Sequence, residues 1–406
     1  MRSTATSSER RRHAMVVHAY YPVGETRVQR EAEALVARGW EVDVLCLRRP
    51  GEARREQLDG IRIHRLPVRR HLRHGMLVQL IEYLAFAAAA LLALSGRQLR
   101  RGYDSVQVHN PPDLLVLCAL VPKLLGVPVI LDVHDLTPEL FASRRASAAT
   151  GALLRTVTLQ ERLACRFADH VITVTDGWRD RLIARGVAAD KVSVTMNVAD
   201  TRLFTRDQES RTGGRADDDG FRVVYHGTLT ERYGVDVLLE AVAKLLPELP
   251  DLRLDVLGDG DARDDLLRRA EELGLDDRVS FSPGMLDVTD VVRHVRRADL
   301  GVVPNRRNPF TDEILPTKLL EYVAVGVPVV ASRTPSLEAY LDPGMVAVSL
   351  AGDAEDLAAC IRHLHDDADA RAALVRAADV FHGRNSWSSI AAAYTARLEA
   401  LVTDRV

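Results

Sequence analysis

The chain has 406 residues, which exceeds what one hydrophobic core usually serves, so two domains are predicted. Its residues are 47% hydrophobic and 27% charged, as is ordinary for a globular protein. Its four cysteines lie far apart, which argues against a zinc site or a disulfide framework and favours buried thiols in a reducing compartment. The net charge is −3, but residues 1 to 205 sum to roughly +9 and the remainder to roughly −12, so the first half favours an anionic partner.

The amino-terminal half alternates short apolar runs with amphipathic segments. Residues 1 to 13 are expected to form a disordered tail, and the apolar run that follows is too short for a secretory signal. A helix is expected over residues 28 to 38, and strands over residues 14 to 19, 42 to 47, 61 to 66, 105 to 109, 127 to 132, 170 to 174 and 192 to 195. Alternation of this kind predicts a parallel sheet with helices on both faces.

Residues 76 to 94 are the only candidate for a membrane segment. A span needs roughly 20 mostly apolar residues, and Gln79 and Glu82 interrupt this one, so we expect a long helix of the first domain. A basic cluster beside an apolar helix can also rest on anionic lipid, so peripheral contact with an anionic membrane is a second expectation. The basic residues that precede the segment are Arg65, Arg69, Arg70, His71, Arg73 and His74.

A second alternating region follows a polar segment. Residues 205 to 220 contain Ala216 as their only apolar residue and are expected to form a linker. Further strands are expected over residues 221 to 226, 252 to 257, 279 to 281, 300 to 304, 327 to 331 and 345 to 348. The expected domains therefore cover residues 14 to 204 and 221 to 385.

The segment from Glu313 to Glu321 reads Glu-Ile-Leu-Pro-Thr-Lys-Leu-Leu-Glu. Pro316 suits the first position of a helix, and the leucine before it has no oxygen to cap the first turn. The first N–H groups of this helix are therefore expected to be open, and with the helix dipole and Lys318 they can hold a phosphate. The two glutamates can accept hydrogen bonds from sugar hydroxyls on either side. A phosphate between sugars indicates a nucleotide-sugar, and an ordinary helix with two solvated acids is the alternative.

This segment, with residues 322 to 331, resembles the signature of family-4 retaining glycosyltransferases of the GT-B fold. Residues 108 to 115, 132 to 139 and 196 to 200 resemble the amino-terminal blocks of the same family. The resemblance implies an α/β fold class, GT-B, with two doubly wound Rossmann-like parallel-sheet domains facing across a cleft. The first would serve the acceptor and the second the nucleotide-sugar. It also implies that residues 386 to 406 form a helix that packs back on the first domain.

Two candidate site residues follow strands of the first domain. Gly24, after the first strand, lets the backbone approach a ligand closely, although relatives often carry two adjacent glycines there. The resemblance places His134 against the transferred sugar, where a neutral imidazole can hydrogen-bond a hydroxyl. A turn glycine and a histidine satisfied within the fold are the alternatives.

In the second domain, the resemblance assigns Gly227 to the phosphate region. Many relatives place an arginine directly after this glycine and a lysine just before the next one, and here Thr228 and Tyr233 hold those places. The charge is therefore assigned to Arg232, because a guanidinium can bridge two phosphate oxygens. The other expected donor-binding residues are Gly258, Ile314, Leu315, Thr317 and Glu321.

Residues 257 to 261 read Leu-Gly-Asp-Gly-Asp and have three interpretations. A dinucleotide fingerprint is weak, since Arg263 stands at the third glycine position. Asp259 and Asp261 resemble the metal-binding acids of the other glycosyltransferase fold. A strand-to-helix turn with a capping aspartate is preferred, with Gly258 allowing close approach to the nucleotide.

The expected reaction is transfer of a sugar from a nucleoside diphosphate sugar to an acceptor hydroxyl with retention of configuration. The catalytic residues would be His134, Glu313, Arg232 and Lys318. The two cations and the helix start would stabilise the leaving diphosphate, Glu321 would hold the ribose and Glu313 the sugar. No second carboxylate is visibly paired with Glu313, so it is not assigned as a nucleophile. No metal and no cofactor beyond the co-substrate are expected.

The expected acceptor is a sugar, a polyprenyl-linked molecule or a lipid, in glycan, polysaccharide or glycolipid synthesis. The expected location is cytoplasmic, with the inner face of the membrane as an alternative, and no nucleic-acid partner is expected. The rival functions are a GT-B-like sugar-nucleotide epimerase, a metal-dependent transferase and a non-catalytic nucleotide-sugar binding protein. The sequence specifies neither the sugar, the base nor the acceptor.

Overall fold

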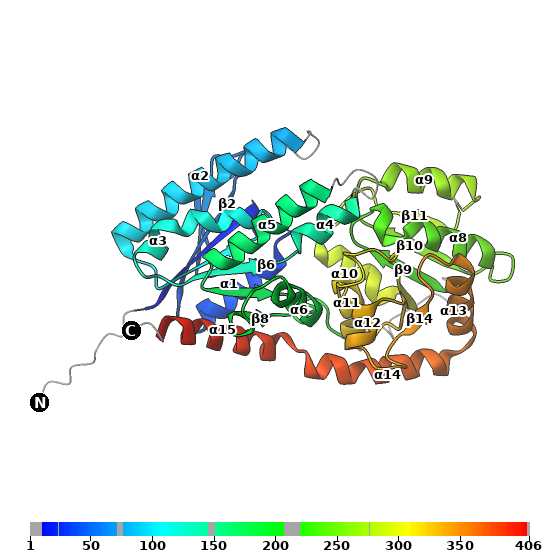
Figure 1. Cartoon of the computed structure of the whole chain (residues 1–406). Helices are drawn as coiled ribbons and strands as arrows, with labels where there is room; N and C mark the ends of the chain where they lie inside the picture. Colours follow the sequence, from blue (N-terminus) through cyan, green and yellow to red (C-terminus); the bar gives the residue numbers. More distant parts are fainter. Residues whose placement is uncertain are drawn as a thin grey trace, which may run out of the picture. The chain divides into compact units, whose positions relative to one another are not determined.

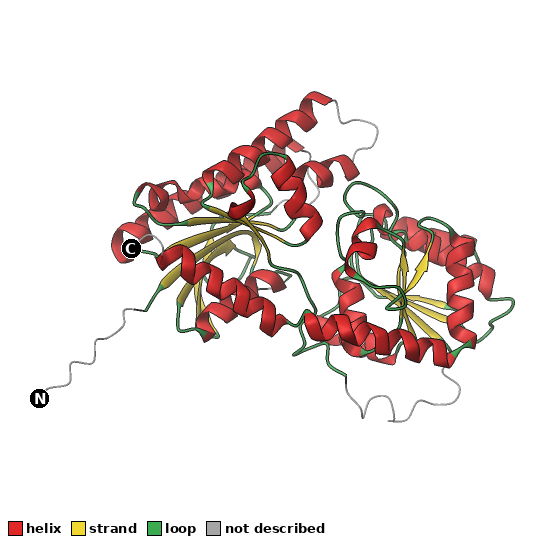
Figure 2. Ribbon diagram, turned by 60° about the horizontal axis from the view of Figure 1, so that its bottom comes forward, coloured by secondary structure: helices red, strands yellow, loops and turns green. Residues whose placement is uncertain are grey.

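The computed structural model describes residues 10–22, 24–70, 76–144, 151–206, 220–275 and 277–403. The chain divides into two compact units, of which unit 1 comprises Met1–Met196 with Ile390–Val406, and unit 2 comprises Asn197–Ser389. Each unit is a sheet with helices on both faces (Figures 1 and 2). The expected tail and linker lie largely outside the described residues.

Unit 1 is built on an eight-stranded sheet, sheet A, in the order β3-β4-β2-β1-β5-β6-β7-β8. All neighbours pair in parallel except β3, which is antiparallel to β4. Strand order reverses between β1 and β5, and ligands of parallel sheets bind at the carboxyl ends beside such a switch point. The strands are β1 (Arg12–Tyr20), β2 (Glu41–Leu47), β3 (Arg55–Leu58), β4 (Ile61–Leu66), β5 (Ser105–His109), β6 (Val129–Val133), β7 (His170–Thr173) and β8 (Val192–Val194).

Sheet A differs from the expectation at β1, at β3 and, by one or two residues, at the ends of β2, β6, β7 and β8. β1 begins at Arg12 and not at Ala14, because Arg12 pairs with Glu41 of β2 and its amide donates to Asp104 at 2.6 Å. β3 was not expected, because its residues are polar and mostly exposed. Its backbone pairing with β4, and not burial of apolar side chains, defines it as an edge strand.

The helices of unit 1 include the long apolar segment. This helix, α2, was expected over residues 76 to 94, and it continues to Arg101. From Leu77 on, this helix has the length and composition of a membrane-crossing helix, and 22% of its most apolar stretch is buried. The helices are α1 (Thr26–Ala37), α2 (Met76–Arg101), η1 (Asp113–Ala119), α3 (Leu120–Leu124), α4 (Thr137–Arg144), α5 (Gly151–Phe167), α6 (Asp176–Ala184), η2 (Ala189–Lys191) and α15 (Trp387–Thr403).

The carboxyl-terminal helix α15 packs on unit 1. Tyr394 and Leu398 are buried in the apolar cluster around Met15 and Val44 of sheet A. The Tyr394 hydroxyl donates to Oε1 of Gln107 in β5 at 2.7 Å. The end of the chain therefore completes the first domain's core.

Unit 2 is built on a six-stranded parallel sheet, sheet B, in the order β11-β10-β9-β12-β13-β14. Its switch point lies between β9 and β12. The strands are β9 (Arg222–His226), β10 (Arg253–Leu257), β11 (Val279–Phe281), β12 (Leu300–Val303), β13 (Val329–Ser332) and β14 (Ala347–Ser349). The helices are η3 (Glu231–Tyr233), α8 (Val235–Leu245), α9 (Arg263–Glu272), α10 (Val288–Arg297), α11 (Thr317–Val325), α12 (Pro335–Tyr340), α13 (Ala354–Asp366) and α14 (Ala368–Arg384).

Candidate functional site

Glycines bring the carboxyl ends of β9 and β10 together. Gly227 follows β9 and Gly258 follows β10, with φ angles of +127° and +149° that residues with side chains rarely adopt. A Cβ atom on Gly258 would lie 1.9 Å from the carbonyl oxygen of Gly227. A Cβ atom on Gly260 would likewise lie 2.1 Å from the carbonyl oxygen of Leu229. Gly227 and Gly258, which were predicted, and Gly260 therefore leave backbone without side chains at the carboxyl ends of β9 and β10, beside the switch point of sheet B.

Helix α11 begins beside this surface. The helix runs over Thr317–Val325, and Pro316 is its N-cap residue, with an extended ψ of 124°, so the proline lies one position before the first helical residue. Within the described part of the chain, no side chain caps the helix and the amides of Thr317 and Lys318 donate to no carbonyl. The amide of Leu319 was also expected to be open, and this is wrong because it donates to the Pro316 carbonyl at 3.0 Å. Two amides and the helix dipole remain for an anion.

Lys318 is held by aromatic side chains next to the glycines. Its Nζ donates to the Tyr225 hydroxyl at 2.8 Å, lies 4.0 Å from the centre of that ring, and lies 3.0 Å from where a Cβ on Gly227 would be. The Tyr225 hydroxyl in turn donates to the Thr228 carbonyl at 2.9 Å. Burial lowers the pKa of Lys318 to about 7, although the charge of Glu321 acts in the opposite direction. An anion at this position would restore the charged form.

Glu321 lies one turn further along α11. Its Oε2 is 3.2 Å from Nε2 of His226, the last residue of β9. Burial, with the charge of Lys318 added, lowers the pKa of His226 to about 3, so the imidazole is neutral near pH 7. The next residue, Tyr322, accepts a hydrogen bond from the His226 amide at 3.1 Å and fixes α11 against β9. The carboxylate is thus positioned at the carboxyl end of sheet B.

Arg232 lies against the loop that precedes α11. Its guanidinium is 5.5 Å from the ring centre of Phe310 and 5.8 Å from that of Tyr233. Lys318 Nζ is 4.7 Å from the same Tyr233 ring, so the structure brings both predicted cations to one aromatic side chain. Glu313 follows in this loop as a half-buried residue whose amide donates to the Phe310 carbonyl at 3.2 Å. The two residues between it and the helix, predicted to contact the donor, are the half-buried Ile314 and the buried Leu315.

The loop after β10 fits the turn interpretation in part. Asp259 Oδ1 accepts a hydrogen bond from the amide of Gly260 at 2.9 Å, which is a local turn contact. The N-cap of α9 is Ala262, and no side chain of the described residues caps that helix, so the expected capping aspartate is wrong. The group of acids and histidines close enough to hold a metal ion lies instead in unit 1, among the residues that the structure describes.

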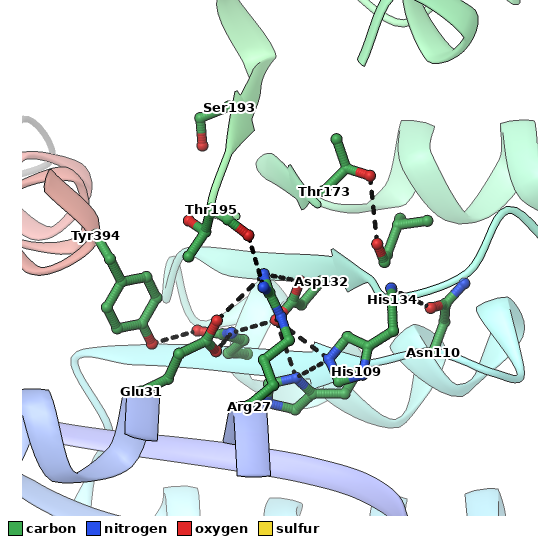
Figure 3. Close-up of polar contacts among 12 residues, drawn as sticks. Arg27, Glu31, His109, Asn110, Asp132, His134, Thr173, Ser193, Thr195 and Tyr394 are labelled. Carbon is green, nitrogen blue, oxygen red and sulfur yellow. Dashed lines mark hydrogen bonds and ion pairs between the residues drawn. The ribbon is translucent and has the colours of Figure 1, made fainter. Parts of the chain in front are cut away.

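In unit 1, a network of buried charges occupies the carboxyl end of sheet A (Figure 3). Arg27 of α1 donates through Nε and Nη2 to the two oxygens of Asp132, at 3.0 and 2.8 Å, and through Nη1 to the Thr195 carbonyl at 2.6 Å. Gln107 donates to Glu31 at 2.8 Å and to Asp132 at 3.1 Å. The bidentate pair with Arg27 holds the pKa of Asp132 well below its usual range, although burial acts in the opposite direction.

His134 lies at the edge of this network. Its Nε2 is 2.9 Å from Nδ1 of His109 and 3.3 Å from Oδ2 of Asp132, and its amide donates to Asn110 Oδ1 at 2.6 Å. Burial opposes protonation of His134, but the negative charge of Asp132 outweighs it, so the pKa of His134 is raised. Burial lowers the pKa of His109 to about 4. His134 is therefore the histidine of the pair that takes up a proton more readily.

His109, Asp132 and His134 offer ligand atoms within 4.8 Å of one another, a spacing that can hold a metal ion. Both oxygens of Asp132 already accept hydrogen bonds from the Arg27 guanidinium. A fixed positive charge on the only carboxylate of the group opposes a second cation there. The arrangement fits a buried polar network better than a metal site.

Gly24 follows β1 and has a φ of +85°. A Cβ atom there would meet nothing within 4 Å, so backbone conformation and not close packing accounts for the glycine. The next residue, Glu25, has a raised pKa because it is buried, and the charge of His134 acts against this. That interaction places the loop after β1 near His134.

Sequence reasoning missed the side chains that orient His134. Asp132 was read as the end of a strand and the first residue of a family block, Glu31 lay in the expected helix without a role, and Arg27 lay just before that helix. The sequence signal was the spacing, because Arg27 and Glu31 are four residues apart and can face each other on a helix. In the structure they form an ion pair at 3.2 Å, on the face of α1 turned toward the sheet. Gln107 and Tyr394, 287 residues apart, carry no local signal.

Both halves of the sequence match domain families of one class of enzyme, the glycosyl transferases. Residues 24–197 match the glycosyl transferase 4-like domain, and residues 206–380 match the glycosyl transferases group 1 domain. The chain is 29% identical to alpha-D-kanosaminyltransferase of Streptomyces kanamyceticus, over 72% of this chain and 83% of that protein. It is 30% identical to D-inositol 3-phosphate glycosyltransferase 1 of Catenulispora acidiphila, over 70% of this chain and 69% of that protein.

Solved structures agree on the fold. Sucrose-phosphate synthase from Thermosynechococcus elongatus superposes with a TM-score of 0.79 at 21% identity, over 97% of this chain and all of that chain (100%). The Anabaena protein HepE, crystallised with UDP-glucose, superposes with a TM-score of 0.72 at 18% identity, over 96% and 99%. Two parallel-sheet α/β domains with these neighbours define a glycosyltransferase of the GT-B fold. With both family domains in place, the chain belongs to the family-4 glycosyltransferases, as the sequence motifs indicated.

Proposed function

We propose that this glycosyltransferase moves a sugar from a nucleoside diphosphate sugar to an acceptor hydroxyl with retention of anomeric configuration. The observation that carries the proposal is the uncapped start of α11 with Lys318 beside Gly227. Two open amides, a cation and bare backbone together fit a diphosphate. The crystallised neighbour with UDP-glucose supports a donor of this kind.

Each candidate residue takes a role that its surroundings permit. Lys318 and Arg232 would neutralise the diphosphate, and Tyr225 would hold the lysine in place through its hydrogen bond of 2.8 Å. Glu321 would accept hydrogen bonds from the ribose hydroxyls, and Glu313 from hydroxyls of the transferred sugar. His134 would hydrogen-bond a sugar hydroxyl through Nδ1, because its Nε2 faces His109 and Asp132.

In the proposed reaction, the bond between the anomeric carbon and the diphosphate oxygen breaks, and a bond from that carbon to the acceptor oxygen forms on the same face. The diphosphate leaves with the bonding electrons, and its oxygen takes up the proton of the acceptor hydroxyl. Lys318, Arg232 and the α11 amides stabilise the charge that develops on the leaving group. No metal is required by this scheme, because the protein supplies the positive charge.

The acceptor class stays open within the proposal. A sugar, a polyprenyl-linked molecule and a lipid all present a hydroxyl, and the products would belong to glycan, polysaccharide or glycolipid synthesis. One relative is named for the sugar that it transfers, kanosamine, and another for D-inositol 3-phosphate, so these names do not fix one acceptor for this chain.

Thermal shift with UDP-, GDP- and ADP-sugars tests the donor first. A donor at 100 times its dissociation constant should stabilise the protein by about 2.7 kcal/mol, and Glu321→Ala should reduce that shift. Product stereochemistry from proton NMR then tests retention. The reaction should proceed in a chelator; loss of turnover with EDTA, restored by a divalent ion, would contradict the metal-free scheme.

A further inference from the structure

Helix α2 is apolar on its outer face as well as on its inner face, and its acid, Glu82, is buried. Its buried side chains recur every four residues at Glu82, Phe86, Ala90 and Leu94. Leu77, Leu84 and Leu92 lie on the opposite face and are 70%, 62% and 75% exposed. A helix at a water-facing surface normally has the reverse pattern, with polar residues outside.

The elements packed beside α2 continue this surface. α2 contacts η1 and α3, and η1 contacts α5, so the four elements form one layer on sheet A (Figure 1). The exposed large apolar side chains of η1, α3 and the residue after it are Leu114, Leu117, Leu120, Leu124 and Leu125. On α5, Leu159 and Leu163 are exposed among Arg155, Arg162 and Arg166. Every described large apolar side chain that is exposed in unit 1 belongs to this layer.

The charges of this layer have one sign on the outside. Its acids are all buried and engaged within the unit: Glu82 pairs with His18 at 3.1 Å, Asp113 accepts from Asn110 at 2.7 Å, and Glu161 accepts from Arg185 at 2.8 Å. The exposed charged side chains of the layer are cations: Arg100 and Arg101 at the end of α2, and Arg155, Arg162 and Arg166 on α5. Arg69 and Arg70 before α2 are also exposed.

We propose that this layer of α2, η1, α3 and α5 is a docking surface for an anionic phospholipid membrane. Leucines on its outer face enter the boundary of the acyl chains, and the arginines bind lipid phosphates. The interaction is independent of the transfer reaction and does not require an acceptor to be bound.

Two other occupants fit less well. α2 cannot span a bilayer while it keeps this fold, because its inner face packs on β1 and β4 and carries the Glu82–His18 pair. A second copy of the chain in a face-to-face dimer would place the same arginine-bearing surface against itself, without acids to match. An anionic lipid surface complements both the apolar and the charged part.

Flotation of the full chain with vesicles tests the proposal. Binding is expected with vesicles that contain phosphatidylglycerol, weaker binding with phosphatidylcholine alone, and a decrease as salt rises. Leu80→Glu with Leu84→Glu should weaken binding at least about tenfold, because these leucines of α2 are 51% and 62% exposed and both are lost from the apolar surface. Arg155→Glu with Arg162→Glu should weaken vesicle binding about fivefold for each arginine. This effect should appear with the vesicles that contain phosphatidylglycerol and not with phosphatidylcholine alone. Leu350→Glu is the matched control, since Leu350 is an exposed leucine of unit 2 and should bind as the wild type.

Three results would overturn the proposal: no flotation of the wild type, equal flotation of the leucine variant, or a wild-type dimer in light scattering that the leucine variant dissociates. Leu92→Glu serves as a second leucine variant in case the first misfolds, and a thermal shift with UDP reports folding of the donor unit in every variant. Loss of the UDP shift with flotation retained would count against the proposed donor and leave the membrane surface standing.

Discussion

The carboxyl ends of the two sheets hold their positive charges in opposite ways. In unit 1, Arg27 is bound by Asp132 and Glu31, and these carboxylates keep its pKa raised even though it is buried. In unit 2, Lys318 lies on aromatic rings, and burial lowers its pKa to about 7. A cation already matched by acids of the protein has little to offer an outside anion. Arg27 therefore has a structural role, and Lys318 is the cation that we propose for a ligand anion.

Asp132→Asn should have the largest effect, because it leaves the buried Arg27 guanidinium without its bidentate carboxylate. Removing one partner of a buried ion pair typically costs about 3 to 5 kcal/mol, so urea denaturation should show a loss of that size in unit 1. Asp379→Asn is the control. Its pair with Arg206 is exposed, so its loss should stay below about 1 kcal/mol. Equal effects of the two substitutions would remove the distinction between structural and surface charge.

Lys318→Met should abolish most turnover while the fold persists, since in the proposed reaction the side chain's positive charge stabilises the leaving diphosphate. Loss of one preorganised charge-stabilising group typically lowers kcat about 100- to 1000-fold. Steady-state kinetics with the best donor measures this, and Lys244→Met, on an exposed ion pair with Glu355, is the control. If Lys318→Met kept wild-type kcat, the lysine would have no part in the reaction.

Glu321→Ala should weaken donor binding by about 1 to 3 kcal/mol, the usual cost of leaving buried polar partners unpaired. Titration calorimetry with the nucleoside diphosphate compares the variant with Glu338→Ala, whose carboxylate forms an exposed pair with Arg333. Unchanged affinity in Glu321→Ala would contradict its contact with the ribose.

Donor affinity should depend on pH through Lys318. The pKa of about 7 belongs to the free protein, and an anion beside the amine raises it, so affinity is at its maximum below about pH 7. Above that value the complex must take up a proton, and affinity should fall by up to about tenfold per pH unit until the pKa of the complex is reached. Calorimetry from acid to alkaline pH measures the slope. Lys318→Met should show none, and a persistent slope in that variant would assign the titration to another group.

The unit 2 site was largely predictable, because its parts lie in short stretches of sequence. Gly227 and Gly258 each follow an apolar run, and residues 313 to 321 contain both glutamates, the proline and the lysine. The pattern could not reveal that Leu319's amide is taken by the Pro316 carbonyl, because a 3₁₀-type bond at a helix start depends on the backbone angle at the N-cap.

The unit 1 site was predictable only at His134. The network behind it joins α1, β5, β6 and α15, whose contacts are set by strand order and by the return of the chain's last helix. Buried polar residues such as Gln107 and Asp132 look like interruptions of an apolar strand until their partners are known. Local propensity describes each strand, but long-range pairing decides which polar side chains are satisfied.

Tyr394→Phe should have the smallest effect and test whether α15 belongs to this network. It removes the hydrogen bond to Gln107 at 2.7 Å but keeps the buried ring, so unfolding should become easier by about 0.5 to 1.5 kcal/mol. Tyr20→Phe is the control, because it also removes a tyrosine hydroxyl but keeps the Tyr20 ring that lies beneath the Arg49 guanidinium. Hydrogen exchange should show faster opening of α15 in Tyr394→Phe alone. A neutral hydrogen bond is weaker than the Arg27–Asp132 pair, so an effect as large as that of Asp132→Asn would mean that the helix, and not the ion pair, holds the charges of unit 1 together.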